Sequence, residues 1–228
     1  RHLTLTAYVE WVLGTSRSAS AFSVVTELDP ETGALLARNP WNTTYGSRVA
    51  FADLAGRQTD WPGDRRDFLG RHGTLAEPAA LLRPGRLSRH VGAGLAPCGA
   101  LQTTFSLEAG QEIEIVSLLG EAADATQAQA LLGRYRSADL DAVFRGVLAH
   151  WDQVLGTVQV KTPDRSLDLI LNRWLLYQTL ACRLWARSGF YQASGAFGFR
   201  DQLQDGMALA ISSPALTREH LLRAAGRQ

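Results

Sequence analysis

The feature that most constrains the fold of this chain is a change in hydrophobic period near residue 120. Before that point, five segments show the two-residue alternation or the β-branched and aromatic enrichment typical of strands. These segments are 4–13, 21–28, 48–53, 98–107 and 111–119. After residue 119, apolar residues recur at helical spacing. Strands followed by helices predict an α+β organisation, and many strands with irregular connections favour an antiparallel β-sandwich for the first part.

The connections between the predicted strands favour the antiparallel arrangement. Residues 29–33 (Asp-Pro-Glu-Thr-Gly) and 108–111 (Glu-Ala-Gly-Gln) have the composition of tight turns. Residues 54–97 are rich in Gly, Pro and Arg, and we expect them to be mostly loop.

Capping residues predict the helices of the second half. Asp124 or Thr126 begins a helix to about residue 136, and 137–139 begins one to about residue 155. Residues 157–161 are expected to be extended, and Thr162-Pro163-Asp164 opens a long helix with proline at its first position. Further helices are expected over 200–211 and after Ser213. The predicted division is a β-sandwich over 1–120, a helical linker over 121–160 and an α domain over 161–228.

Composition excludes several classes of partner. A formal net charge of +1 gives no electrostatic reason to expect nucleic acid. No signal peptide is visible, and no apolar run reaches the ~18 residues of a membrane span, so direct membrane contact is not expected. Cys98 and Cys182 lie far apart without metal-ligand spacing, which predicts two buried free thiols in a reducing, cytoplasmic setting. The five histidines show no metal-ligand spacing either.

Residues 190–205 combine an aromatic, glycine-containing loop with a polar helix start. Arg200 and Asp201 lie in the expected first turn, and Gln204 and Asp205 follow one turn later. We expect Asp201, Gln204 and Asp205 to share one helix face. Sugars need this mixture, because a pyranose presents hydroxyl edges to polar groups and C–H faces to rings. The alternative is a purely structural helix start, with Asp201 favoured by the helix dipole and Arg200 in a surface ion pair.

Several segments resemble one enzyme family when they are taken together. Tyr191 to Asp205 and residues 174–178 (Trp-Leu-Leu-Tyr-Gln) resemble the inverting glycoside phosphorylases typified by cellobiose phosphorylase. The similarity is closer still to the phosphorylase-like region of cyclic β-1,2-glucan synthases. It extends through nearly the whole chain, including residues 7–14, 38–42 and 68–71.

The resemblance implies a fold and a set of ligands. Family members have an N-terminal β-sandwich, a helical linker and an (α/α)6 barrel, so the chain is expected to hold the first two and the opening barrel helices, cut at both ends. The family's Arg-Asp pair, here Arg200 and Asp201, binds the transferred glucosyl unit. The other implied substrate-binding residues are Gln204, Asp205, Tyr191 and Gln192. The resemblance implies β-glucan oligosaccharides as partners, inorganic phosphate as co-substrate, no cofactor and a candidate homodimer.

No catalytic residue is assigned within the chain. The family's general acid is an aspartate in an Asp-Trp-Asn-Asp segment, and the only similar run, Asp60-Trp61-Pro62-Gly63-Asp64, lies in the wrong domain. Inverting chemistry needs an acid on the leaving oxygen, so we expect these residues alone to be inactive. The resemblance is compatible with two kinds of complete protein. One is a soluble phosphorylase, and the other is an inner-membrane synthase with this region on the cytosolic side. A non-catalytic carbohydrate-binding module and a purely structural module of a larger synthase are the alternatives.

Overall fold

The computed structural model describes residues 1–82, 85–185 and 199–226. These residues form two compact units, which divide between Ala138 and Asp139. No helix in the described ranges is long and apolar enough to cross a lipid bilayer. The predicted division into segments 1–120, 121–160 and 161–228 stays a prediction.

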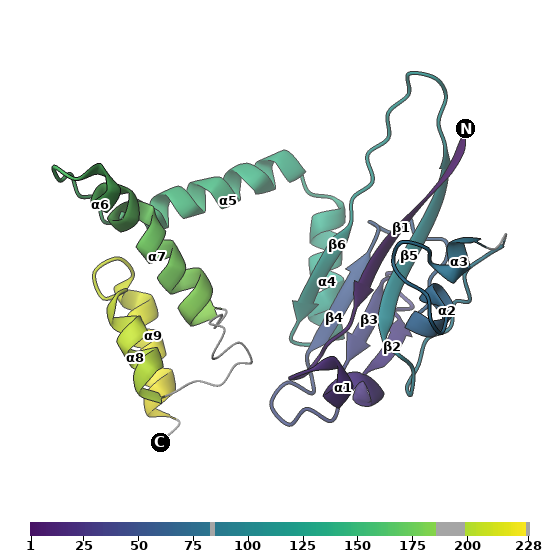
Figure 1. Cartoon of the computed structure of the whole chain (residues 1–228), viewed down its shortest axis with the longest axis horizontal. Helices are drawn as coiled ribbons and strands as arrows, with labels where there is room; N and C mark the ends of the chain where they lie inside the picture. The colour runs from purple at the N-terminus through teal and green to yellow at the C-terminus, as the bar shows by residue number, and fades with distance from the viewer. Residues whose placement is uncertain (83–84, 186–198, 227–228) are drawn as a thin grey trace. The chain divides into compact units, whose positions relative to one another are not determined.

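Two antiparallel sheets form the first unit (Figure 1). Strand β1 (His2–Glu10) pairs with β5 (Cys98–Ser106) along its whole length, from His2 opposite Ser106 to Glu10 opposite Cys98. The second sheet has the order β2-β3-β4-β6. Its strands are β2 (Val25–Leu28), β3 (Leu35–Arg38), β4 (Val49–Asp53) and β6 (Leu118–Ala122). The prediction of antiparallel sheets is therefore confirmed.

Strand β3 lies at the centre of the packing because both of its faces are buried. Leu35 and Ala37 belong to a cluster that includes Leu101 of β5, so this face meets the two-stranded sheet. Leu36 points the other way, into a cluster with Leu132 of helix α4 (Ala125–Arg136). Successive strand side chains alternate between faces, which is why adjacent leucines enter separate clusters. Each fully buried leucine contributes about 2 kcal/mol.

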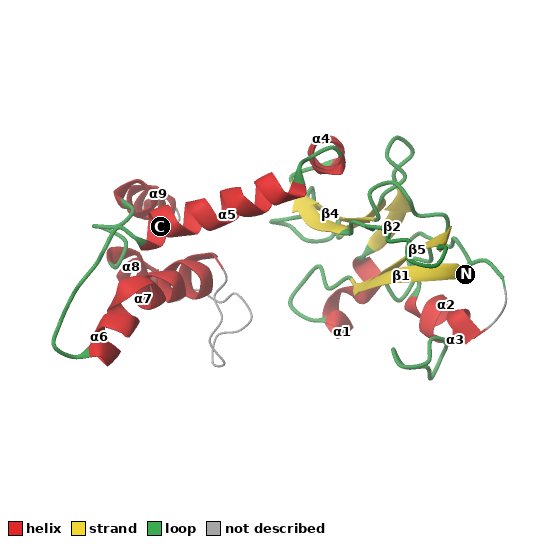
Figure 2. Ribbon diagram, turned by 90° about the horizontal axis from the view of Figure 1, so that it is seen from above, coloured by secondary structure: helices red, strands yellow, loops and turns green. Residues whose placement is uncertain are grey.

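Short helices complete the first unit (Figure 2). They are α1 (Arg17–Ser20), which continues into a 3₁₀ turn (Ala21–Ser23), α2 (Arg65–Leu69) and α3 (Ala79–Leu82). Asp124 caps α4 as predicted, with its carboxylate accepting from the Gln127 N–H at 2.8 Å. Outside α2 and α3, the described residues of this stretch, 54–82 and 85–97, have no regular structure apart from isolated bridges at Asp60 and Asp64, as expected.

Three strand predictions need correction. The segment 21–28 is a strand only from Val25, because its first residues form the 3₁₀ turn. The segment 111–119 alternates in sequence but forms no ladder before Leu118, since β4 pairs with Leu118–Ala122 instead. Strand β3 was not predicted, because a strand buried on both faces shows no alternation.

Helices alone form the second unit within the described ranges. Helix α5 (Leu140–Leu155) begins after Asp139, whose carboxylate accepts from the Ala142 N–H at 3.0 Å, as predicted. Next come α6 (Arg165–Leu169), an irregular wide turn (Ile170–Trp174), α7 (Leu175–Tyr177) and a π-helical segment (Gln178–Trp185). Helices α8 (Phe199–Met207) and α9 (Pro214–Ala225) follow, and Ser213 precedes α9 as expected.

The long helix expected after Thr162 is interrupted. Its cap is Asp164, so Pro163 precedes the helix rather than occupying its first position. The chain leaves helical geometry at Asn172 and Arg173, where Arg173 has a φ of 72°. The Asn172 amide explains the break, because it accepts from the Val160 N–H at 2.7 Å and donates to the Val160 carbonyl at 2.9 Å. These two bonds hold Asn172 against the segment that precedes the helix.

Both cysteines are free. Cys98 is buried, as predicted, whereas Cys182 is only half-buried, which corrects the expectation of two buried thiols. Burial raises the pKa of Cys98 to about 12, with the nearby carboxylate of Asp64 adding to the effect. The Cys98 thiol is therefore protonated at neutral pH.

Candidate functional site

Helix α8 carries the polar residues predicted to bind substrate. It begins at Phe199, one residue before the predicted start, and ends at Met207 rather than near Ile211. Residues three and four apart lie on the same helix face, so Arg200, Leu203, Gln204 and Met207 form one face. The charged and amide groups of that face are therefore interleaved with apolar side chains.

This face lines an open groove of about 670 Å³. Phe199, Arg200, Leu203, Gln204 and Met207 of α8 contribute to it, together with Leu221 of α9. Arg200 and Gln204 are exposed to solvent there. The groove thus offers a guanidinium and an amide beside an apolar surface, a combination typical of small-molecule sites.

The two predicted carboxylates of α8 are not among the residues that line the groove. Asp205 accepts from Arg183 of the π-helical segment, with 2.9 Å between Nε and Oδ2, and the Asp205 side chain is 18% exposed. Asp201 is half-buried and engaged in an interaction of its own. Gln204 lies three residues after Asp201 and next to Asp205, so it borders both carboxylates on the helix surface, but of these three residues only Gln204 lines the groove.

Packing against α9 fixes the orientation of α8. A Cβ on Gly206 would lie 3.1 Å from Cδ2 of His220, so glycine lets α8 and the His220 ring of α9 approach closely without a shift of that ring. His220 Nε2 donates to the Gln202 carbonyl at 3.0 Å, and Thr217 Oγ1 donates to the Gly206 carbonyl at 3.3 Å. These contacts occupy one side of α8 and leave the groove face open.

Two other predicted site residues, Tyr191 and Gln192, lie outside the described residues. Arg183 was missed by sequence reasoning, since an arginine inside an apolar helical stretch gives no signal of its partner 22 positions later. The structure thus brings Arg200 and Gln204 together on the groove, while Asp205 is joined to Arg183.

The Asp-Trp segment of the first unit has structural roles. Asp60 accepts from Arg89 Nε at 2.8 Å, and the Arg89 guanidinium lies 5.0 Å from the centre of the Trp61 ring. Asp64 caps α2 through the Arg66 N–H at 2.8 Å. These contacts explain the segment without any acid–base role.

One group of potential metal ligands occurs among the described residues. Ligand atoms of Asp64, Asp67 and His90 lie within 4.8 Å of one another. His90 Nδ1 lies 3.2 Å from Asp67 Oδ2, and Asp64 is already engaged by Arg66. Sequence spacing gave no sign of the group, because His90 is distant from the two aspartates along the chain.

Comparison with known proteins assigns both units to one family. Residues 1–138 match the model described as "Glycosyl hydrolase 94, supersandwich domain", and residues 150–228 match "Glycosyl hydrolase 94 superfamily, catalytic domain". The first match covers the unit with the two antiparallel sheets. The second includes α8 and the groove.

Named relatives agree with this assignment. The chain is 42% identical over 228 residues to "Cyclic beta-(1,2)-glucan synthase NdvB" of Rhizobium meliloti (strain 1021), which covers 100% of the chain and 8% of the relative. It is 32% identical over 166 residues to "N,N'-diacetylchitobiose phosphorylase" of Vibrio furnissii, which covers 71% of the chain and 20% of the relative. It is also 32% identical over 173 residues to "Solabiose phosphorylase" of Paenibacillus borealis, at 75% and 22% coverage.

The chain spans between 8% and 22% of the length of these three relatives. The two family models nevertheless match almost all of the chain, and only residues 139–149 lie between the matched regions. This agrees with the resemblance seen in the sequence. The chain belongs to the glycosyl hydrolase 94 family.

Proposed function

We propose that this chain is part of an enzyme that transfers glucosyl units of β-linked glucans, by inverting phosphorolysis that releases glucose 1-phosphate. A phosphate oxygen forms a bond to the anomeric carbon from the face opposite the leaving group. The glycosidic C–O bond breaks, and the leaving oxygen takes a proton from a general acid. Family membership supports the proposal, as do relatives named as a glucan synthase and as phosphorylases.

One observation carries the assignment of the binding site. Arg200 and Gln204 both line the groove of about 670 Å³, and Phe199 adds a ring to the same lining. A pyranose can place its hydroxyl edge on the guanidinium and amide while its C–H face covers the apolar side chains. In this proposal Arg200 binds the transferred glucosyl unit from the groove, and the role of Asp201, which does not line the groove, rests on the family resemblance. Supporting contacts come from Gln204, Asp205, Tyr191 and Gln192.

The proposal includes features that the relatives' names do not address. The helices of the second unit belong to an (α/α)6 barrel, and the protein acts in the cytoplasm, without a cofactor, as a homodimer. Inorganic phosphate is the co-substrate. Because the 228 residues hold no Asp-Trp-Asn-Asp segment, we expect them to bind glucan without turning it over by themselves.

The test replaces Asp201 with asparagine in the complete gene product that contains these residues. Phosphate-dependent release of glucose 1-phosphate is measured with β-1,2-, β-1,3- and β-1,4-linked glucans. We expect turnover of the preferred glucan to fall about 100-fold, the loss typical when a charged contact to the transition state is removed.

Asp152→Asn is the matched control in the same unit. Asp152 is 70% exposed and forms an ion pair with Arg173 at 2.8 Å, so its loss should leave turnover close to that of the wild type. Turnover of Asp201→Asn equal to that of the control would contradict the assigned role. Release of glucose without a need for phosphate would contradict phosphorolysis.

Trp41 favours a second candidate, a non-catalytic carbohydrate-binding role of the first unit. Trp41 is 81% exposed on a loop that Asn42 orders, since the Asn42 carboxamide oxygen accepts from the N–H groups of Thr44 and Tyr45 at 3.0 and 2.9 Å. An exposed ring on an ordered loop is a platform for a sugar face. If this role holds, Trp41→Ala abolishes retention by a glucan gel while glucose 1-phosphate release is unchanged.

A further inference from the structure

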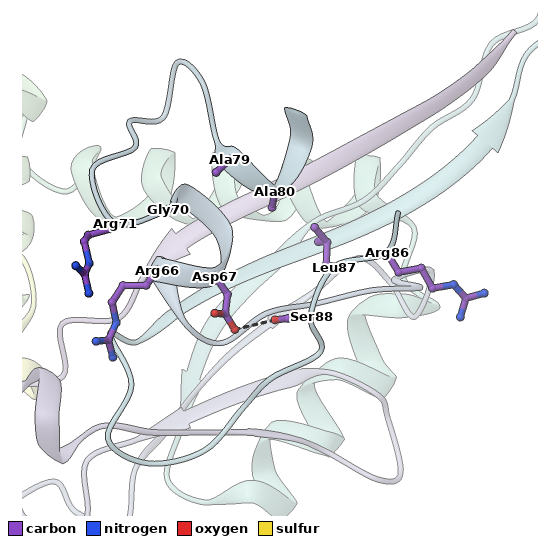
Figure 3. Close-up of a pocket in the computed structure, with 9 residues that line it drawn as sticks. All are labelled: Arg66, Asp67, Gly70, Arg71, Ala79, Ala80, Arg86, Leu87 and Ser88. Carbon is purple, nitrogen blue, oxygen red and sulfur yellow. Dashed lines mark hydrogen bonds between the residues drawn. The ribbon is translucent and has the colours of Figure 1, made fainter. Parts of the chain in front are cut away.

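A hollow of about 450 Å³ lies in the first unit, between α2, α3 and residues 86–88 (Figure 3). Arg66 and Asp67 of α2 line it together with Arg71, and Arg86 and Ser88 line it from the later segment. In Figure 3, Arg66 and Arg71 extend on one side of the hollow and Arg86 on the other. Asp67 and Ser88 lie between them.

The hollow rests on the packed core. Its lining includes Leu87, which is buried and packs in a cluster with Phe68 and Ala100. Gly70 ends α2 with a φ of 88°, and a Cβ there would lie 3.1 Å from that of Ala79 in α3. Glycine therefore allows both the sharp turn after α2 and the close approach of α3. The walls are held by these contacts and by the cluster beneath them.

The charge of the lining is strongly positive. Three guanidinium groups line the hollow with one carboxylate, Asp67. That carboxylate accepts from Ser88 Oγ at 3.0 Å and lies 3.2 Å from His90 Nδ1. Arg66 lies 3.5 Å from Asp64, whereas Arg71 and Arg86 form no ion pair with any carboxylate of residues 1–82, 85–185 and 199–226. The unpaired cations favour an anionic ligand.

We propose that this hollow binds a small polyhydroxylated oxyanion of about the size of a hexose phosphate. The oxyanion bonds to Arg66 and Arg71, whose planar donor groups match phosphate or carboxylate oxygens. Hydroxyl groups of the ligand bond to Asp67 and Ser88. The volume lies within the range of about 300–1,000 Å³ that is usual for ligand pockets. A cation on Asp67 is disfavoured, because the guanidinium groups of Arg66, Arg71 and Arg86 line the same hollow. The inference does not depend on the proposed function.

The test titrates the 228-residue protein with glucose 6-phosphate, inorganic phosphate and glucose by isothermal calorimetry. We expect saturable binding of glucose 6-phosphate and none of glucose over the same concentrations. Arg71→Ala should weaken that binding about tenfold, the effect of removing one hydrogen-bonded charge at an exposed site. Arg71→Lys keeps the charge but not the planar donor group, so an intermediate loss is expected.

Arg38→Ala is the matched control, because Arg38 is also an exposed arginine of the first unit but does not line the hollow. Its binding should equal that of the wild type. Equal affinity of Arg71→Ala and Arg38→Ala, or binding of glucose as tight as that of glucose 6-phosphate, would overturn the proposal. A tenfold loss in Arg200→Ala would instead place the binding in the second unit and overturn it as well. If inorganic phosphate binds as tightly as glucose 6-phosphate, the hydroxyl groups of the sugar contribute nothing, which would contradict their proposed bonds to Asp67 and Ser88.

Arg71 makes no ion pair within the described residues, so its replacement should leave the melting temperature unchanged. If Arg71→Ala nevertheless fails to fold, Arg66→Ala gives the same measurement. Amide chemical shifts of the wild type provide an independent one, since glucose 6-phosphate should shift residues of α2 and α3. Shifts confined to α8 and α9 would overturn the proposal.

Discussion

Replacing Arg136 with alanine should strongly destabilise the first unit. The Asp53 side chain on β4 is 0% exposed, and its carboxylate receives two bonds from Arg136 of α4. The distances are 2.9 Å from Nε to Oδ2 and 2.7 Å from Nη2 to Oδ1. Nη2 also donates to the Thr32 carbonyl at 2.7 Å, so one side chain joins α4 to β4 and to the turn between β2 and β3.

The magnitude follows from what remains after the substitution. Removing one member of a buried ion pair costs about 3–5 kcal/mol, because the other charge stays buried. Here Asp53 keeps the Gln58 amide at 2.7 Å and the Gly56 N–H at 3.2 Å. Two remaining donors place the expected loss at the lower end, about 3 kcal/mol. For a unit of this size, that corresponds to a fall of about 10 °C in melting temperature.

The assay is urea and thermal unfolding followed by circular dichroism, with hydrogen exchange of β4 and α4 to localise the loss. Arg48→Ala is the control, because it removes an exposed pair with Glu121 that should contribute at most about 1 kcal/mol. Adding Asp53→Asn to Arg136→Ala should restore part of the stability, since a buried neutral amide costs less than a charge. A loss no larger than that of Arg48→Ala, or no recovery in the double variant, would show that the buried charge of Asp53 does not depend on Arg136.

Two further predictions concern titratable groups of the first unit. Burial would raise the pKa of Glu10, but hydrogen bonds from Tyr8 and Arg65 outweigh it and hold that pKa below its usual value. Glu10 therefore stabilises the fold above its usual pKa of about 4.3 and loses this effect as the pH falls through the lowered pKa. The urea midpoints of wild type and Glu10→Gln should differ at pH 7, and the difference should shrink as the pH falls through that lowered pKa. A pH-independent difference would contradict this. In native protein at pH 8, a thiol reagent should modify Cys182 but not Cys98, because the pKa of about 12 keeps the buried Cys98 thiol protonated. Rapid labelling of the Cys182→Ser variant, in which Cys98 is the remaining thiol, would contradict this.

Local signals explain which elements could be predicted from the sequence. Helices α4 and α5 were predicted with their caps, because Asp124 and Asp139 act on backbone groups only three residues away. Strand β3 was missed because its burial depends on two partners, the β1–β5 sheet and α4, that the sequence does not reveal locally. The break at Asn172 was missed for the same reason, since its amide bonds to Val160, twelve positions earlier.

The candidate site shows the same limit. The resemblance identified Arg200 and Gln204, and both line the groove. Helical spacing alone could not decide which side of α8 faces the groove, since that depends on packing with α9 and on the contact between Arg183 and Asp205. Sequence reasoning therefore named the polar residues of α8 but did not separate Arg200 and Gln204, which line the groove, from the two carboxylates, which do not.

The different uses of the sides of α8 support the proposed glucosyl site. One side packs on α9 through Gly206, and another is joined to Arg183 through Asp205. The remaining side keeps Phe199 and Met207 exposed next to Arg200. Apolar surface left in water forgoes about 25 cal/mol per Å², so covering this face, by a ligand or by further residues of the proposed barrel, is favourable. A sugar ring would cover the apolar groups with its C–H face while its hydroxyl edge satisfies the guanidinium, and that is the chemistry the proposed transfer of a glucosyl unit requires.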